Sequence, residues 1–278
     1  MDKNKNTSSV VDALKMTNNV CPYFNLKTYI PSRKSAERLI YDIQNLFFPM
    51  VFPTPFTEEE MLFDTTELLS GIIENESVAL EFMLELPAIK RRLLNDASAI
   101  YEGDPAATSA EEIILAYPGF FSTFVHRIAH SLYLKKIPYL PRLMSEIAHE
   151  KTGIDIHPGA EIGERFCIDH GTGVVIGETA RIGDRVKIYQ GVTIGAKSFE
   201  IDENGKLKKG GKRHPDIGNN CIIYAGATIL GGDTKIGDNC IIGGNVWLTH
   251  SLPPGSKIYY NEKGLLHLGI IERKGRGT

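Results

Sequence analysis

The chain has 278 residues, of which 42% are hydrophobic and 23% charged. This is an ordinary globular composition, and the length suffices for one large domain or two smaller ones. The formal net charge of −3 gives no indication of nucleic-acid binding, and no apolar run approaches the roughly 18 residues that cross a bilayer. The N-terminus lacks the basic and apolar segments of a signal peptide, and the four cysteines show no CxxC spacing. We therefore expect a cytoplasmic protein with reduced thiols, without nucleic-acid or membrane partners.

The first half of the chain has the pattern of a helical domain, which we place at residues 31–153. Only three of the 27 glycines precede residue 150, and glycine is a poor helix residue. Apolar spacing predicts helices over residues 36–47, 58–73, 77–100, 120–136 and 143–152. Thr57, followed by three glutamates, is a predicted N-cap, and Gly153 follows the last helix. Residues 1–30 are polar and unpatterned, so we expect a flexible arm there.

The second half of the chain repeats every six residues. Aliphatic or small residues open successive hexads at Ile162, Ile168, Val174, Ala180, Val186 and Val192, and again at Ile217, Ile223, Ile229, Ile236, Ile242 and Leu248. A sustained hexad predicts a parallel β-helix, in which three hexads form one coil and stacked coils share a core. We place the β-helix at residues 154–255 and a tail at 256–278. Acyltransferases use this scaffold repeatedly.

One long segment interrupts the hexads, KSFEIDENGKLKKGGKRHP at residues 197–215. It is polar and Gly-rich, so it cannot fill the interior, and we predict an extruded loop at about 197–213. Such a loop either has a function or is a solvent-exposed insertion without one. It lacks the spacing of a P-loop, although its lysines could meet phosphates.

Polar residues cluster in a repeat that otherwise favours small ones: Asp155, His157, Asp169, His170, Arg213 and His214. We interpret them as one shared site. Because one coil has about 18 residues, Asp155 and His170 are expected on neighbouring coils near one edge. A carboxylate on one imidazole nitrogen would fix the tautomer and let the other nitrogen take a proton from a substrate hydroxyl. The alternative is an Asp–His pair that only ties coils together.

Other candidate residues carry less weight. His126 and His130 have the helical spacing of a metal pair, but no third ligand is evident, and we predict no metal. Cys167 offers an acyl-enzyme route in principle, but the hexad alternation points it away from the neighbours of His170. Cys221 precedes an aliphatic pair, which indicates packing, and Cys240 does the same.

Several segments carry a resemblance to a known family: GDPAA at 103–107, HRIAHSLY at 126–133, DIHPGAEIG at 155–163, IDHGTGVVIGETARIGD at 168–184, QGVTIGA at 190–196 and KRHPDIGN at 212–219. On these segments the chain resembles the serine O-acetyltransferases of the hexapeptide-repeat superfamily. The resemblance implies an α+β fold, with a helical N-terminal domain followed by a left-handed parallel β-helix. It also implies a homotrimer, or a hexamer formed as a dimer of trimers.

The implied reaction transfers acetyl from acetyl-CoA, as co-substrate and without a metal, to the hydroxyl of L-serine. The products are O-acetyl-L-serine and CoA, in L-cysteine biosynthesis. By this resemblance His170 is the general base, Asp155 its orienting carboxylate and His214 a second active-site histidine that also contacts serine.

The resemblance also assigns binding residues. Asp104 and Asp169 lie near the serine ammonium, and Arg213 binds the serine carboxylate, as a zwitterion requires. The CoA groove between adjacent subunits is lined by small residues: Gly195, Ala196, Ala225, Gly243 and Gly244. Family members that dock onto cysteine synthase end in isoleucine, whereas this chain ends in Thr278, so we predict no stable complex with that enzyme.

Three other hypotheses remain open at this point. The first is a hexapeptide acyltransferase acting on a sugar or another small acceptor. The second is a zinc enzyme of the trimeric β-helix carbonic anhydrase type, with zinc bound by His157, His170 and His214. The third is a trimeric scaffold without catalytic activity.

Overall fold

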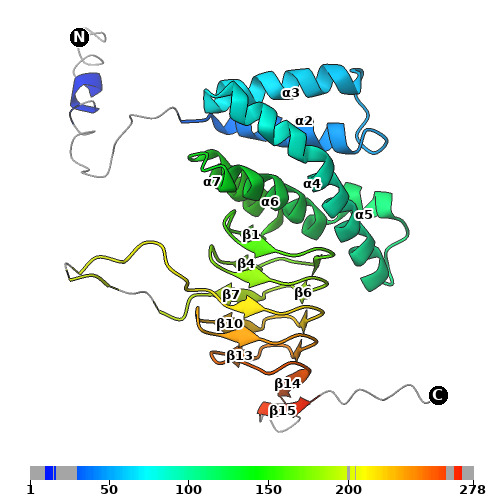
Figure 1. Cartoon of the computed structure of the whole chain (residues 1–278), viewed down its shortest axis with the longest axis vertical. Helices are drawn as coiled ribbons and strands as arrows, with labels where there is room; N and C mark the ends of the chain where they lie inside the picture. Colours follow the sequence, from blue (N-terminus) through cyan, green and yellow to red (C-terminus); the bar gives the residue numbers. More distant parts are fainter. Residues whose placement is uncertain are drawn as a thin grey trace, which may run out of the picture.

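In the computed structural model, a group of helices stands on one end of a triangular β-helix (Figure 1). The structure describes residues 10–14, 16, 30–198, 201–203, 205–260 and 266–270. Most of the predicted N-terminal arm lies outside the described residues. So does Thr278, on which the cysteine synthase prediction rests.

The helices are α2 (Arg33–Phe47), α3 (Glu58–Ile73), α4 (Glu76–Gly103), α5 (Ala110–Ala116), α6 (Pro118–Leu134) and α7 (Leu140–Thr152). All five predicted helices are present. Thr57 caps α3 as predicted, and the carboxylate of Glu60 accepts a hydrogen bond from the backbone N–H of Thr57, which completes a capping box. The seven-residue α5 was not predicted, because it is too short to show a period.

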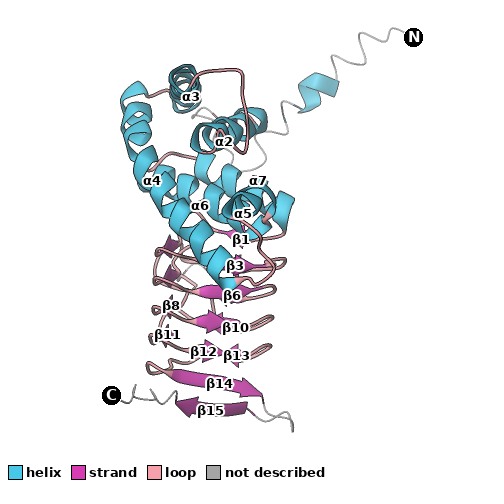
Figure 2. Cartoon of the chain, turned by 90° about the vertical axis from the view of Figure 1, so that its right-hand side faces the viewer, coloured by secondary structure: helices cyan, strands magenta, loops and turns pink. Residues whose placement is uncertain are grey.

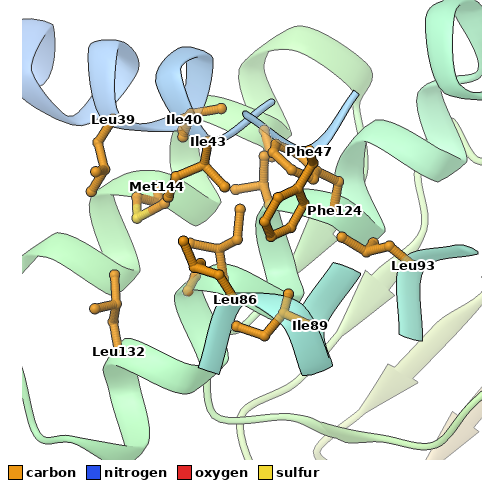
Figure 3. Packing of buried hydrophobic residues seen from close by; sticks show 14 of the residues in the cluster. Leu39, Ile40, Ile43, Phe47, Leu86, Ile89, Leu93, Phe124, Leu132 and Met144 are labelled. Carbon is orange, nitrogen blue, oxygen red and sulfur yellow. The ribbon is translucent and has the colours of Figure 1, made fainter. Parts of the chain in front are cut away.

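The apolar faces of these helices meet in one core, part of which Figure 3 shows. Leu39 and Ile43 of α2 point toward Met144 of α7 and Leu86 of α4 (Figure 3). Phe47 meets Phe124 of α6 edge to face, with 6.1 Å between ring centroids. Among the described helices, none combines the length and the apolar character needed to cross a membrane.

The rest of the chain forms short strands: β1 (Asp155–Ile156), β2 (Glu161–Ile162), β3 (Cys167–Asp169), β4 (Val175–Ile176), β5 (Arg181–Ile182), β6 (Lys187–Tyr189), β7 (Thr193–Gly195), β8 (Asp216–Ile217), β9 (Ile222–Ile223), β10 (Thr228–Leu230), β11 (Lys235–Ile236), β12 (Ile241–Ile242), β13 (Trp247–Leu248), β14 (Ser256–Tyr260) and β15 (Leu266–Ile270). They form three sheets, which are the faces of the prism. Face A has the order β1-β4-β7-β10-β13, face B β2-β5-β8-β11, and face C β3-β6-β9-β12-β14-β15.

Two of the three edges of the prism carry candidate site residues. Edge 1 comprises the turns from face C to face A, at residues 170–174, 190–192, 224–227 and 243–246. Edge 2 comprises the turns from face A to face B, at residues 157–160, 177–180, 196–215 and 231–234. The long turn of edge 2 is the predicted extruded loop, which leaves the prism between β7 and β8 (Figure 1).

The interior of the prism matches the hexad pattern, since its opening residues are buried in a single core. The first coil is longer than predicted. Asp155 pairs with Val175, 20 residues further on, whereas Val175 pairs with Thr193, 18 residues further on. Asp155 and His170 therefore share the first coil, which corrects their predicted placement on neighbouring coils. The two extra residues enlarge the edge 1 turn at 170–174 compared with the three-residue turn at 190–192.

The predicted tail also differs from the structure. β14 pairs in parallel with β12 and continues face C, and β15 adds an antiparallel strand below it. Ile258 is buried in the prism core, which explains why the segment does not leave as a tail. At the other end of the prism, α4 runs obliquely down to the level of β3 and β6 (Figure 2).

Candidate active site

The structure places the predicted polar residues in two groups on different edges of the prism. Asp169 ends β3 and His170 begins the first turn of edge 1, while Asp104 joins them from the C-terminal end of α4. Arg213 and His214 close the long loop of edge 2. Face A separates the two groups within one chain.

Asp104 is held in place by two hydrogen bonds. Its Oδ1 accepts from the backbone N–H of Ala106 at 2.8 Å, and its Oδ2 accepts from the hydroxyl of Tyr117 at 2.8 Å. These two bonds, in that order, lower the pKa of Asp104. The same carboxylate raises the pKa of Tyr117 to about 12. Asp104 is thus a fixed anion, and Tyr117 is a contact that the sequence analysis missed.

Lys187 of β6 also belongs to this group and was not predicted. Its Nζ lies 2.8 Å from Oδ2 of Asp169 and donates a hydrogen bond to the carbonyl oxygen of Gly103 at 2.8 Å. Burial by itself would lower the pKa of Lys187, but the hydrogen bond to Asp169 and the contact with Tyr189 outweigh it and raise that pKa. Lys187 therefore joins the end of α4 to the first two coils.

His170 projects from the enlarged turn. Its backbone is left-handed, with φ of 57°, and its side chain is 75% exposed. Nε2 of His170 lies 3.8 Å from Oδ1 of Asp169. Gly171 follows with φ of 94°, and a Cβ there would lie 2.4 Å from Cδ1 of Ile154, so this turn needs glycine. The two extra residues thus present the imidazole outside the prism.

Asp155 does not pair with His170 in the described part of one chain. It opens β1 beside the end of α7, where one ligand atom each of Asp155, Glu146 and His149 lies within 4.8 Å of the others. Of the described residues, these three come closest to a metal-binding arrangement. Arg142 already pairs with Glu146, which disfavours a cation there. The predicted absence of a metal stays a prediction.

His214 on edge 2 is held as a neutral hydrogen-bond donor. Its Nδ1 accepts from the backbone N–H of Thr179 at 3.1 Å, so the ring proton lies on Nε2. Burial first, and then the charge of Arg213, lower the pKa of His214 to about 4. Nε2 lies against Gly177, where a Cβ would come within 2.0 Å of it. His214 is therefore suited to donate a hydrogen bond rather than to act as a base near neutral pH.

Arg213 is paired before any substrate arrives. Its guanidinium forms an ion pair with Glu178, which also accepts a hydrogen bond from the hydroxyl of Tyr133 at 3.0 Å. Burial tends to raise the pKa of Glu178, but the bonds from Arg213 and Tyr133 lower it. Tyr133 comes from α6, so the helical domain reaches edge 2 as well as edge 1. Both Glu178 and Tyr133 lie in segments that carry the resemblance, yet their roles were not predicted.

A search of protein-family models finds no match. A curated plasmid-encoded serine acetyltransferase from Synechococcus elongatus is 45% identical over 264 residues, covering 82% of this chain and 81% of the relative. The chain belongs to the serine acetyltransferase family.

Solved serine acetyltransferases share its fold. The crystal structure of serine acetyltransferase 1 from Entamoeba histolytica in complex with L-cysteine matches with a TM-score of 0.73 and 39% identity, over 82% of this chain and 87% of that one. A serine acetyltransferase in complex with CoA matches with a TM-score of 0.60 and 25% identity, over 84% of each chain. The predicted α+β class, with helices followed by a parallel β-helix, is confirmed.

The residues predicted to bind CoA in this acetyltransferase also lie in two groups, one on edge 1 and one on edge 2. Ala225, Gly243 and Gly244 line a 440 Å³ groove along edge 1, beside Tyr224 and Tyr259. Gly195 and Ala196 lie at edge 2, where the long loop leaves β7. The loop forms a second cavity, of 480 Å³, whose lining includes four basic residues: Lys197, Lys208, Lys212 and Arg213.

The surroundings of the remaining candidate residues argue against a zinc site within the chain and against a thiol nucleophile. His157 accepts a hydrogen bond at Nδ1 from the backbone of Gly159 at 3.0 Å and lies on edge 2. It therefore does not converge with His170 on a zinc site within the chain. His126 is buried next to His130, with 5.6 Å between ring centroids. Burial raises the pKa of the Cys167 thiol to about 12, which disfavours a thiolate nucleophile.

Proposed function

We propose that this serine acetyltransferase transfers the acetyl group of acetyl-CoA to the hydroxyl of L-serine, giving O-acetyl-L-serine and CoA for L-cysteine biosynthesis. The observation that carries the proposal is the grouping of Asp104, Asp169 and His170 at edge 1, where two carboxylates lie beside an exposed imidazole. The family membership supports the same conclusion.

The acceptor is recognised as a zwitterion. Asp104 and Asp169 bind the ammonium of serine, and the guanidinium of Arg213 binds its carboxylate. Once both charged groups are bound, the hydroxyl is the group that faces His170. A neutral sugar carries neither charge and a hexosamine lacks the carboxylate, so either would leave charged side chains of the site unmatched.

The site is assembled between protomers of a homotrimer. The residues proposed to bind L-serine lie partly on edge 1 and partly on edge 2, and so do those proposed to bind CoA. Face A separates these two edges in one chain. A three-fold axis can bring edge 1 of each protomer against edge 2 of its neighbour, giving three equal sites. The pairing of trimers into a hexamer, the absence of a cysteine synthase complex and the cytoplasmic location stay predictions from the sequence.

The chemistry is a direct transfer. His170 takes the hydroxyl proton as the serine oxygen attacks the thioester carbonyl, and it returns the proton to the departing CoA sulfur. His214, neutral with its proton on Nε2, donates a hydrogen bond to the substrate. Asp155 orients His170 in this proposal, through a contact formed in the assembled site.

Thiol release from acetyl-CoA tests this function, measured with L-serine, with L-threonine, with a hexosamine and without acceptor. Serine-dependent release is expected, and His170→Ala should lower kcat by about 10² to 10⁴. His250→Ala, an exposed histidine outside the site, is the matched control. Release with the hexosamine but not with serine would instead support the sugar acyltransferase, and an active His170→Ala would contradict the mechanism.

Co-expression of two inactive variants tests the shared site. If edge 1 of one protomer meets edge 2 of the next, random mixing of His170→Ala and Arg213→Ala chains restores about a quarter of the sites. If each chain carried a complete site, mixing would restore none. Homotrimers of either variant alone provide the baseline.

A further inference from the structure

Lys187 already occupies the pocket that is proposed to bind the ammonium of the acceptor. β3 and β6 pair in parallel, with Cys167 beside Lys187 and Asp169 beside Tyr189. The side chain of Lys187 therefore reaches back from the second coil to the first, where its Nζ lies 2.8 Å from Asp169. It is 17% exposed, so its charge is largely removed from water.

Two further contacts hold the ammonium of Lys187 in this position. The carbonyl oxygen of Gly103, the residue before Asp104, accepts a hydrogen bond from Nζ at 2.8 Å. The ring of Tyr189 lies under the ammonium, with 4.7 Å from Nζ to the ring centroid. Tyr189 in turn stacks on Tyr224, with 5.2 Å between centroids and 6° between planes. The cation is thus fixed by the carboxylate of Asp169, the carbonyl oxygen next to Asp104 and an aromatic surface.

The charges in the pocket then have a definite balance. Asp104 and Asp169 contribute two negative charges, and Lys187 contributes one positive charge. The pocket therefore presents a net charge of about −1 to the acceptor, which one ammonium neutralises. Without Lys187, the same pocket would present about −2 and would bind an ammonium more tightly.

We propose that Lys187 is the internal counter-ion of the ammonium pocket, a specificity-determining residue that weakens the ground-state binding of the amino-acid acceptor. This inference rests on the proposed function. The lysine allows two carboxylates to lie close together while only one uncompensated charge remains to attract the substrate. It sets the KM for serine without taking part in proton transfer.

Lys187→Gln tests the counter-ion, because glutamine keeps a hydrogen-bond donor but removes the charge. We expect the KM for L-serine to fall at least about fivefold, which is the effect of one charge roughly 5 Å away at a water-like effective dielectric constant of about 70. The KM for acetyl-CoA and kcat should change less than about threefold, because the lysine contacts neither CoA nor His170. The fall in KM should shrink at about 0.5 M salt.

Two variants control the measurement. Lys187→Arg keeps the charge and should keep a KM for serine near that of the wild type. Lys235→Gln removes an exposed lysine of face B, so it should leave both KM values unchanged. Circular dichroism and the melting temperature show whether each variant is folded, and Lys187→Met provides a second neutral variant if Lys187→Gln is not.

The outcomes separate this inference from the proposed function. Wild-type enzyme that releases no thiol with serine would overturn the proposed function and this inference with it. Active wild type with an unchanged KM for serine in the folded neutral variants would overturn the counter-ion alone. A KM that rises in the neutral variants and is restored in Lys187→Arg would also overturn it, because Lys187 would then only position Asp169.

Discussion

A buried ion pair joins the helical domain to the β-helix, and breaking it should destabilise the whole protein. Arg127 of α6 binds Asp96 of α4 in bidentate geometry, with N–O distances of 2.6 and 2.9 Å. It also donates to the carbonyl oxygens of Ile162 at 3.2 Å and Gly163 at 2.7 Å in the first coil. Asp96 accepts in addition from the backbone N–H of Phe166 at 2.9 Å.

The structure sets the size of the effect. Arg127→Met removes four hydrogen bonds and leaves the carboxylate of Asp96, whose side chain is 0% exposed, without its cation. Loss of one partner from a buried pair costs about 3–5 kcal/mol, because a charge stays buried and unpaired. Replacing both partners, as in Asp96→Leu with Arg127→Met, removes that charge. The double variant should therefore lose about 2 kcal/mol less than the sum of the single variants.

Equilibrium urea unfolding measures these free energies. Protein concentration must be the same for all variants, because the stability of the proposed trimer would depend on it. Asp96 lies on α4, whose C-cap is Asp104, so the single variants should also raise the KM for serine at temperatures below unfolding. A cost below about 1 kcal/mol for Arg127→Met, or strictly additive single and double variants, would refute the reasoning.

Three substitutions at the site and a change of pH should have measurable effects. Gly177→Ala should lower kcat/KM at least about tenfold with the fold retained, because its Cβ would displace the ring of His214; steady-state kinetics and melting curves check this. As pH falls from about 6.5 to about 4, His214 takes up a proton in the unfolded state but stays neutral in the folded state. The free energy of unfolding should therefore decrease over this range, and it should decrease less in the His214→Gln variant, as urea unfolding at each pH would show. Cys167→Ala should keep kcat within about threefold, because the thiol is not a nucleophile; a larger loss would revive the acyl-enzyme route. Tyr117→Phe should raise the KM for serine about threefold to tenfold in the thiol-release assay, because Asp104 loses a hydrogen bond.

Much of the fold could be predicted because its signals are local and periodic. The hexads indicate the β-helix, and the cap at Thr57 and the spacing from Ala36 to Phe47 indicate helices. The coil length could not be predicted at the first turn, where two extra residues after Asp169 do not change the character of the sequence. Asp155 and His170 share a coil because His170 precedes Val175, the partner of Asp155 at the start of the second coil.

The side chains that pair with the charged residues of the site could not be predicted, because these contacts join residues that are distant in the sequence. Lys187 meets the end of α4, 84 positions away, and Tyr133 meets Glu178, 45 positions away. A lysine on a strand and a tyrosine on a helix have no local sign of such contacts. Only the stacking of coils and the position of the helical domain bring them together.

Both halves of the proposed site hold their charged residues already paired. Asp169 has Lys187 as its cation, and Arg213 has Glu178 as its anion. A substrate with one charge would have to compete with one of these pairs and leave the other half of the site unchanged. A zwitterion engages both halves at once and adds no net charge, so the cost of sharing each pair is offset at both ends. This arrangement favours a free amino acid over a simple amine or a simple hydroxy acid, and it does so only when the two edges of neighbouring protomers meet.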